Sequence, residues 1–84
     1  MPDASDFSAE IKARFKRGLE ASASFVEITS GDVHREVGGY PGSNHRMPVC
    51  CEVMYAEMTE RDELLSAPPK GKGATLTIRY QLPR

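Results

Sequence analysis

Apolar side chains recur at every fourth position near the start of the chain and form one stripe: Phe7, Ile11, Phe15 and Leu19. A stripe with this period predicts an amphipathic helix. Asp6 is a suitable N-cap for that helix, which we expect to end between residues 21 and 24. Residues 1–5 are then expected to be a disordered tail and residues 6–84 a single domain.

The following segment contains a short strand pattern and a short helix pattern. Residues 25–28 (FVEI) favour β-structure, but they are too few for more than a small edge strand. Val33 and Val37 are the i, i+4 apolar pair of a short helix, which two glycines then end. On so short a helix we expect His34 and Arg35 to lie at the solvated surface.

A third helix is predicted after a turn rich in glycine and proline. Pro41-Gly42 suits a type II turn, Asn44 is a good N-cap, and Pro48 is tolerated in a first helical turn. Apolar residues follow at three- and four-residue spacing: Met47, Cys50, Cys51, Met54 and Met58. The pattern indicates a helix over residues 44–58 whose stripe belongs to the core, with one cysteine buried and the other at its rim.

The last third of the chain predicts a β-hairpin. Residues 62–66 can form one strand, and residues 74–82 alternate as a half-buried strand does, with Leu76, Ile78 and Tyr80 on one face and Thr75, Thr77 and Arg79 on the other. Between them, residues 67–73 (APPKGKG) are incompatible with regular structure. A hairpin with a protruding basic tip is therefore expected.

The order of these elements is helix, short strand, short helix, turn, longer helix and hairpin. From about Asp6 to Pro83 it resembles a winged helix-turn-helix domain, which implies an α+β fold of three helices with a small antiparallel β-hairpin wing. The segment 31–55 (GDVHREVGGYPGSNHRMPVCCEVMY) also resembles a small bacterial family of uncharacterised proteins.

The resemblance to winged-helix domains implies binding of double-stranded DNA in a regulatory role. In such domains the N-terminal residues of the third helix read DNA, and here these residues are Ser43, Asn44, His45 and Arg46. Arginine pairs with guanine and asparagine with adenine, and either can hold a phosphate. The wing would contact the DNA backbone through Lys70 and Lys72, and Arg79 is a further expected contact.

The charge distribution refines this hypothesis. The net charge is −1, yet residues 64–84 hold Lys70, Lys72, Arg79 and Arg84 and no acid. A basic segment of this kind steers partners locally even where the net charge does not. The second half of the third helix carries Glu52 and Glu57, which phosphates would repel. The helix is therefore expected to meet DNA end-on, by its first turn.

Composition limits the compartment and the membrane partners. The chain has no long apolar run, and its acidic N-terminus lacks the apolar region of a secretory signal. Its two cysteines are sequence neighbours, a pattern unlike that of a disulfide-stapled secreted domain. We therefore expect a cytoplasmic protein with no membrane partner.

Three catalytic or ligand-binding alternatives have weaker support. Adjacent Cys50 and Cys51, with His34 and His45, depart from the usual spacing of zinc ligands. Cys50 lies beyond the first turn, where the helix dipole does little to activate a thiol. Neither PPKGKGAT nor GGYPGS fits a phosphate-binding motif. The sequence therefore favours a protein that is not an enzyme and needs no cofactor.

The main alternative function is protein interaction on the same fold. The nearly neutral charge and the acidic end of the third helix suit a module that forms a homodimer or docks another protein without binding DNA.

Overall fold

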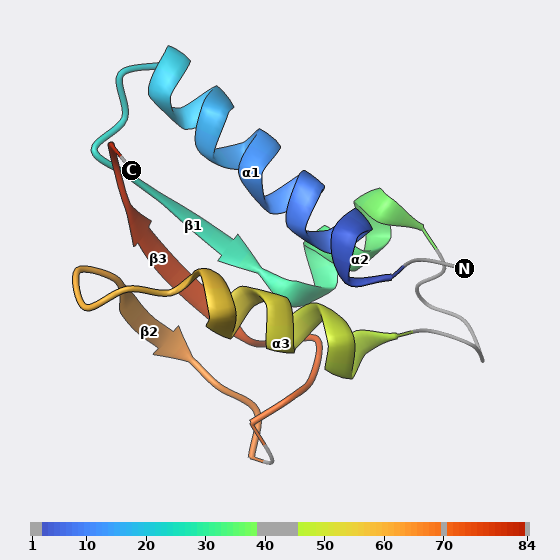
Figure 1. Ribbon diagram of the computed structural model, residues 1–84. Coiled ribbons are helices and arrows are strands. Elements are labelled where there is room, and N and C mark those ends of the chain that lie inside the picture. The colour runs from blue at the N-terminus through green and yellow to red at the C-terminus, as the bar shows by residue number, and fades with distance from the viewer. Residues whose placement is uncertain (1–2, 39–45, 70, 84) are drawn as a thin grey trace.

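The computed structural model describes residues 3–38, 46–69 and 71–83. Within them the fold is α+β, with three helices and a three-stranded antiparallel sheet (Figure 1). The elements follow in the order α1 (Ala4–Glu20), β1 (Phe25–Thr29), α2 (Ser30–Val37), α3 (Met47–Glu57), β2 (Glu63–Ser66) and β3 (Thr77–Gln81). The expected order of elements is therefore confirmed. No helix in the described part of the chain has the length and hydrophobicity to cross a bilayer.

The sheet has the strand order β1-β3-β2, so β3 is central and the hairpin strands are neighbours. On its inner face, Ile28 of β1 and Leu64 of β2 both pair with Ile78 of β3. One residue further along β3, Arg79 pairs with Glu27 and Glu63 on the outer face. The alternation seen in the sequence thus separates an apolar face from a charged one.

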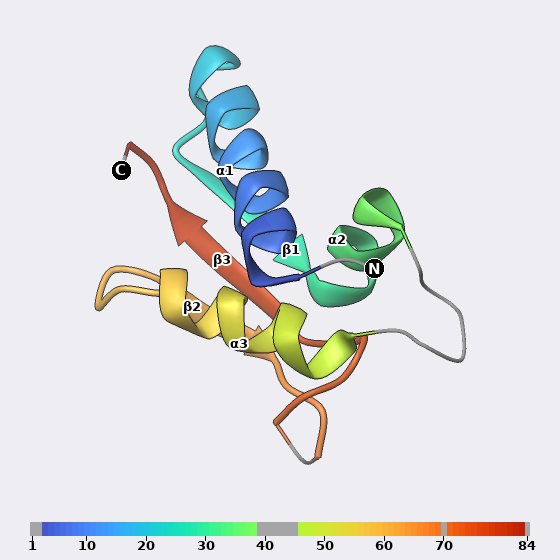
Figure 2. The ribbon, with the colours of Figure 1, turned by 45° about the vertical axis from the view of Figure 1, so that its right-hand side comes forward.

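Helices α1 and α3 cover the inner face of the sheet (Figures 1 and 2). The Phe15 ring of α1 meets the Tyr80 ring of β3 edge-on at 5.1 Å between centroids. The Tyr80 hydroxyl donates a 2.7 Å hydrogen bond to the carbonyl of Met54 in α3. Helix α2 closes one end of this core with Val33. The buried tyrosine therefore has both an aromatic neighbour and a partner for its hydroxyl.

Helix α1 begins earlier than the sequence pattern indicated. Its N-cap is Asp3, whose carboxylate accepts hydrogen bonds from the backbone N–H groups of Ser5 and Asp6. The carboxylate of Asp6, the expected N-cap, instead accepts a 2.9 Å hydrogen bond from the Asp3 N–H and completes a capping box. Residues 3–5, expected in a tail, therefore form the cap and first turn of a helix.

Burial differs from expectation at two further places. His34 is fully buried, not solvated, because α2 turns it inward against the Phe7 ring of α1, 4.9 Å away between centroids. Cys50 and Cys51 are both fully buried, whereas we expected one at the rim of the core. Cys50 faces α2, and Cys51 lies beneath the loop that joins β2 to β3, so two different elements cover them.

Candidate nucleic-acid interface

The start of α3 carries the first expected DNA contact that the structure describes. Arg46 is the N-cap of α3, its side chain is exposed, and it forms no ion pair with any described residue. Pro48 lies in the first turn, as expected. The other residues assigned to this site, Ser43, Asn44 and His45, lie outside the described ranges. The helix begins at Met47, and its N-cap is therefore Arg46, where we expected Asn44. A helix N-terminus beside a cation suits an anion.

A buried histidine fixes the position of this helix start. Nε2 of His34 accepts a 2.8 Å hydrogen bond from the backbone N–H of Arg46. A ring nitrogen that accepts carries no proton, so the neutral imidazole holds its proton on Nδ1. The ring also packs on Phe7 of α1. The first residue of the candidate site is therefore tied to both preceding helices.

The loop between β2 and β3 is anchored along α3 by three side chains. Tyr55 donates its hydroxyl to the Gly71 carbonyl at 2.6 Å. The Cys51 sulfur lies 3.3 Å from the Gly73 N–H, which donates to it, and 3.2 Å from the Gly73 carbonyl. Nζ of Lys72 lies 2.8 Å from the Glu52 carboxylate. The loop projects beyond the sheet next to α3 (Figures 1 and 2), but these contacts hold it there.

The end of the same loop is also bonded to the start of α2. The Ser30 hydroxyl donates to the Gly73 carbonyl, and the Gly31 N–H donates to the Ala74 carbonyl at 3.0 Å. A Cβ on Gly31 would lie only 2.9 Å from that carbonyl oxygen, so a side chain here would displace the loop. Together, α2 and α3 hold the loop from both sides.

The pair formed by Lys72 and Glu52 changes the electrostatics expected for α3. The hydrogen bond from Lys72 to the Glu52 carboxylate, and the charge of that carboxylate, raise the pKa of Lys72. The acid that we expected to repel DNA is thus half of a salt bridge at the surface. An exposed pair of this kind is weak. The lysine can therefore exchange its carboxylate for a phosphate at small cost.

Arg79 does not join Arg46 and Lys72. It lies on the outer face of β3, because its neighbours Ile78 and Tyr80 are buried on the inner face, where Tyr80 contacts Met54 of α3. Its guanidinium is 2.8 Å from Glu27 and 3.6 Å from Glu63, and it covers the Phe25 ring at 4.7 Å. Arg79, a further expected DNA contact, therefore lies on the face of the sheet away from α3 and is paired with acids there. Lys70, the remaining expected contact, lies outside the described ranges.

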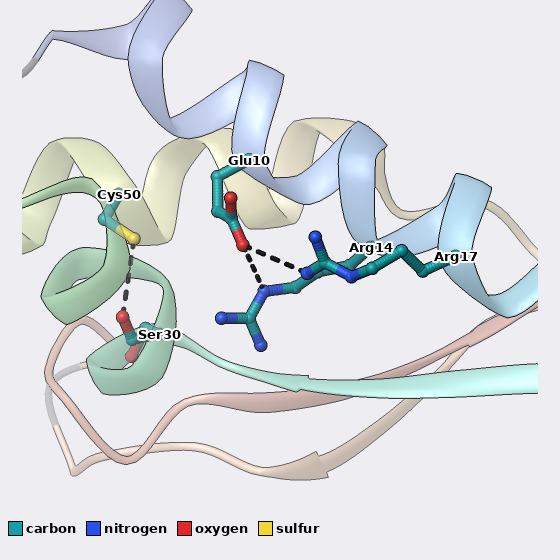
Figure 3. Close-up of polar contacts among 5 residues, drawn as sticks. All are labelled: Glu10, Arg14, Arg17, Ser30 and Cys50. Atoms are coloured by element: carbon teal, nitrogen blue, oxygen red, sulfur yellow. Dashed lines mark hydrogen bonds and ion pairs between the residues drawn. The ribbon is translucent and has the colours of Figure 1, made fainter.

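Cys50 has the environment of a structural thiol. Burial, and secondarily the charge of Cys51, raises the pKa of Cys50 to about 12. Its thiol donates a weak hydrogen bond to the Ser30 carbonyl, 3.6 Å away (Figure 3). Nearby on α1, the Glu10 carboxylate forms ion pairs with Arg14 and Arg17. A thiol with so high a pKa is protonated at neutral pH and is a poor nucleophile. Among the described residues, no three histidine, cysteine or acidic side chains gather as metal ligands would.

Sequence reasoning missed the residues that hold the site together. His34, Cys51 and Tyr55 each contact a segment at least 12 residues away in sequence. Such contacts depend on the tertiary arrangement, and no local pattern in the sequence indicates them.

Comparison with known proteins gives no relative from which a function could be transferred. No protein-family model matches the chain, and no curated protein or solved structure matches it. The function must therefore be argued from the arrangement of the residues.

Proposed function

We propose that this protein is a winged-helix domain that binds double-stranded DNA with the start of α3 and the loop between β2 and β3. The observation that carries the proposal is the attachment of that loop to α3 by Tyr55 and Cys51. Because the loop is held against the helix, the cation of the loop keeps a fixed position relative to the cation at the start of α3. A firm surface loses little conformational entropy when it binds.

The chemistry of the two parts is complementary to a DNA backbone. The exposed Arg46 stands at the positive end of the α3 dipole and has no described acid as a partner. Lys72 reaches a phosphate by leaving Glu52, and Lys70 is in the same loop sequence. Glu57 follows in the last turn of α3, so the approach is end-on, by the first turn of the helix. Arg79 has no part in this interface, because it lies on the opposite face of the sheet.

The proposal is tested by fluorescence anisotropy of labelled duplex DNA of mixed sequence, measured over a salt series. Binding should weaken steeply as salt rises, because cations that neutralise phosphates release counterions. Arg46→Ala should reduce discrimination between sequences, whereas the double variant Lys70→Ala, Lys72→Ala should weaken binding to all sequences alike.

Arg17→Ala is the matched control for these variants. Arg17 is an exposed cation in the last turn of α1, and it pairs with Glu10 at 3.4 Å. Its removal changes the net charge by the same amount as Arg46→Ala and should leave DNA affinity nearly unchanged. Absence of binding at low salt contradicts the proposal, and so does an equal loss of affinity in Arg17→Ala and Arg46→Ala.

A second candidate function, protein interaction or homodimerisation, is favoured by the edge strand β2. All four of its residues are exposed, and Leu64 and Leu65 show 45% and 38% of their surfaces. An exposed edge with apolar side chains can pair with a strand of another chain. Light scattering coupled to size exclusion tests homodimerisation, and a strictly monomeric protein that binds no partner in a pulldown counts against this candidate.

A further inference from the structure

A groove lies between α1 and the C-terminal end of α3, away from the proposed DNA interface. It has a volume of about 600 Å³. Side chains of both helices and of the segment after α3 line it: Lys12, Phe15, Lys16, Leu19, Ala56 and Thr59, with Glu57. Small-molecule sites commonly have volumes of about 300–1,000 Å³. The groove is therefore large enough for a ligand of several rings or a short alkyl chain.

The apolar part of the groove comes mainly from α1. Phe15 is 7% exposed and is held edge-on by Tyr80, so it is a fixed surface at the base of the groove. Leu19, one turn further along, is 41% exposed. Ala56 provides a small apolar side chain on the opposite wall. An apolar group bound here would remove Leu19 from water.

The charged part of the groove comes from the same helix. Lys12 and Lys16 are four residues apart, so they lie on one face of α1 about 5–6 Å from each other at Cβ. Neither lysine forms an ion pair within the described residues, whereas Arg14 and Arg17 on the same helix both pair with Glu10. The two lysines outnumber Glu57, the single acid of the lining. The groove is therefore complementary to an anion attached to an apolar body.

We propose that this groove binds a small amphipathic carboxylate, such as an arylalkyl or short-chain alkyl acid. The apolar body lies on Phe15 and Leu19, and the carboxylate accepts hydrogen bonds from Lys12 and Lys16. An ammonium–carboxylate contact is a charge-assisted hydrogen bond, and the apolar base lowers the local dielectric around it. The site shares no residue with the proposed DNA interface, and the proposal does not depend on DNA binding.

The test is a titration of the ¹⁵N-labelled protein with 4-phenylbutyrate, followed by NMR, with 4-phenylbutyramide as the uncharged analogue. Saturable shifts are expected along residues 12–19 and 56–59. The carboxylate should bind about tenfold more tightly than the amide, because only the carboxylate carries a negative charge that the two ammonium groups attract. Lys12→Gln with Lys16→Gln should abolish that difference and leave the weak binding of the amide unchanged.

Two further variants separate the site from general effects of charge or folding. Arg17→Gln removes a cation from another face of α1 and should leave the affinity for 4-phenylbutyrate unchanged. Leu19→Ser alters an already exposed side chain and should weaken the carboxylate and the amide together. Absence of saturable shifts, equal affinity for the two ligands, or shifts confined to another part of the protein would each overturn the proposal. Binding of an acidic peptide but not of 4-phenylbutyrate would also overturn it and would mark the groove as a protein-docking site.

Discussion

Substitution of His34 by phenylalanine removes the acceptor that holds the start of α3. Phenylalanine keeps an aromatic contact with Phe7 but is larger than histidine, so the variant loses the 2.8 Å hydrogen bond to the Arg46 N–H and must also fit extra volume into a fully buried site. A hydrogen bond of this kind contributes about 1 kcal/mol net. Arg46 is exposed, so water can replace the lost acceptor, and this hydrogen bond sets the lower limit of the penalty, to which the packing of the larger ring adds. In a domain of 84 residues, ~1 kcal/mol corresponds to a fall in Tm of about 4–8 °C.

The assay combines urea unfolding with amide hydrogen exchange at Arg46. In the wild type this amide should exchange slowly, and in His34→Phe it should exchange faster than its neighbours in α3. His34→Gln retains a side-chain carbonyl that can accept from the same N–H, so it should keep more of the protection although it loses ring contacts. DNA affinity should fall in His34→Phe because Arg46 is no longer held. Rapid exchange of the Arg46 amide in the wild type, or full protection in His34→Phe, would refute the role given to the histidine.

Three further predictions concern the loop and the core. Glu52→Gln should strengthen DNA binding severalfold at low salt, because it releases Lys72 from its 2.8 Å ion pair and removes a charge that repels phosphate. Unchanged affinity in anisotropy titrations would contradict this prediction. Gly31→Ala should lower the free energy of unfolding by about 1–3 kcal/mol, because its Cβ would lie 2.9 Å from the Ala74 carbonyl oxygen; wild-type stability in urea would show that the loop yields. The pKa of Cys50 is raised in the folded state to about 12, so the thiol of the unfolded state loses its proton first as the pH rises. The free energy of unfolding should therefore fall above about pH 8.5. Cys50→Ala should lack this part of the alkaline loss of stability, and identical pH profiles of the two proteins would contradict the prediction.

Local patterns in the sequence were sufficient for most of the fold. The alternation of Leu76, Ile78 and Tyr80 gives the inner face of the sheet correctly, because a strand places successive side chains on opposite faces. The start of α1 was misplaced because Asp3 and Asp6 are both good caps, and only the hydrogen bonds show that they form a reciprocal box. Local signals therefore identify the elements more reliably than their ends.

The candidate site was less accessible from sequence, because its contacts join distant segments. The pairing of Lys72 with Glu52 depends on how the loop returns along α3, which no local pattern encodes. Arg79 was grouped with the other cations by its charge. The strand order then gave it Glu27 and Glu63 as partners on the outer face. The alternation along β3 puts Arg79 on the other face of the strand from Ile78 and Tyr80. This pattern in the sequence already separates Arg79 from the face that α3 covers.

The central claim is that one surface, formed by the start of α3 and the loop between β2 and β3, contacts double-stranded DNA. Titration of the ¹⁵N-labelled protein with duplex DNA, followed by NMR, tests it most directly. The account predicts the largest shifts at Arg46 and the first turn of α3 and around Lys72, with Arg79 and its outer-face partners unaffected. Shifts centred on Arg79 and the outer face of the sheet, or no shifts at low salt, would contradict it.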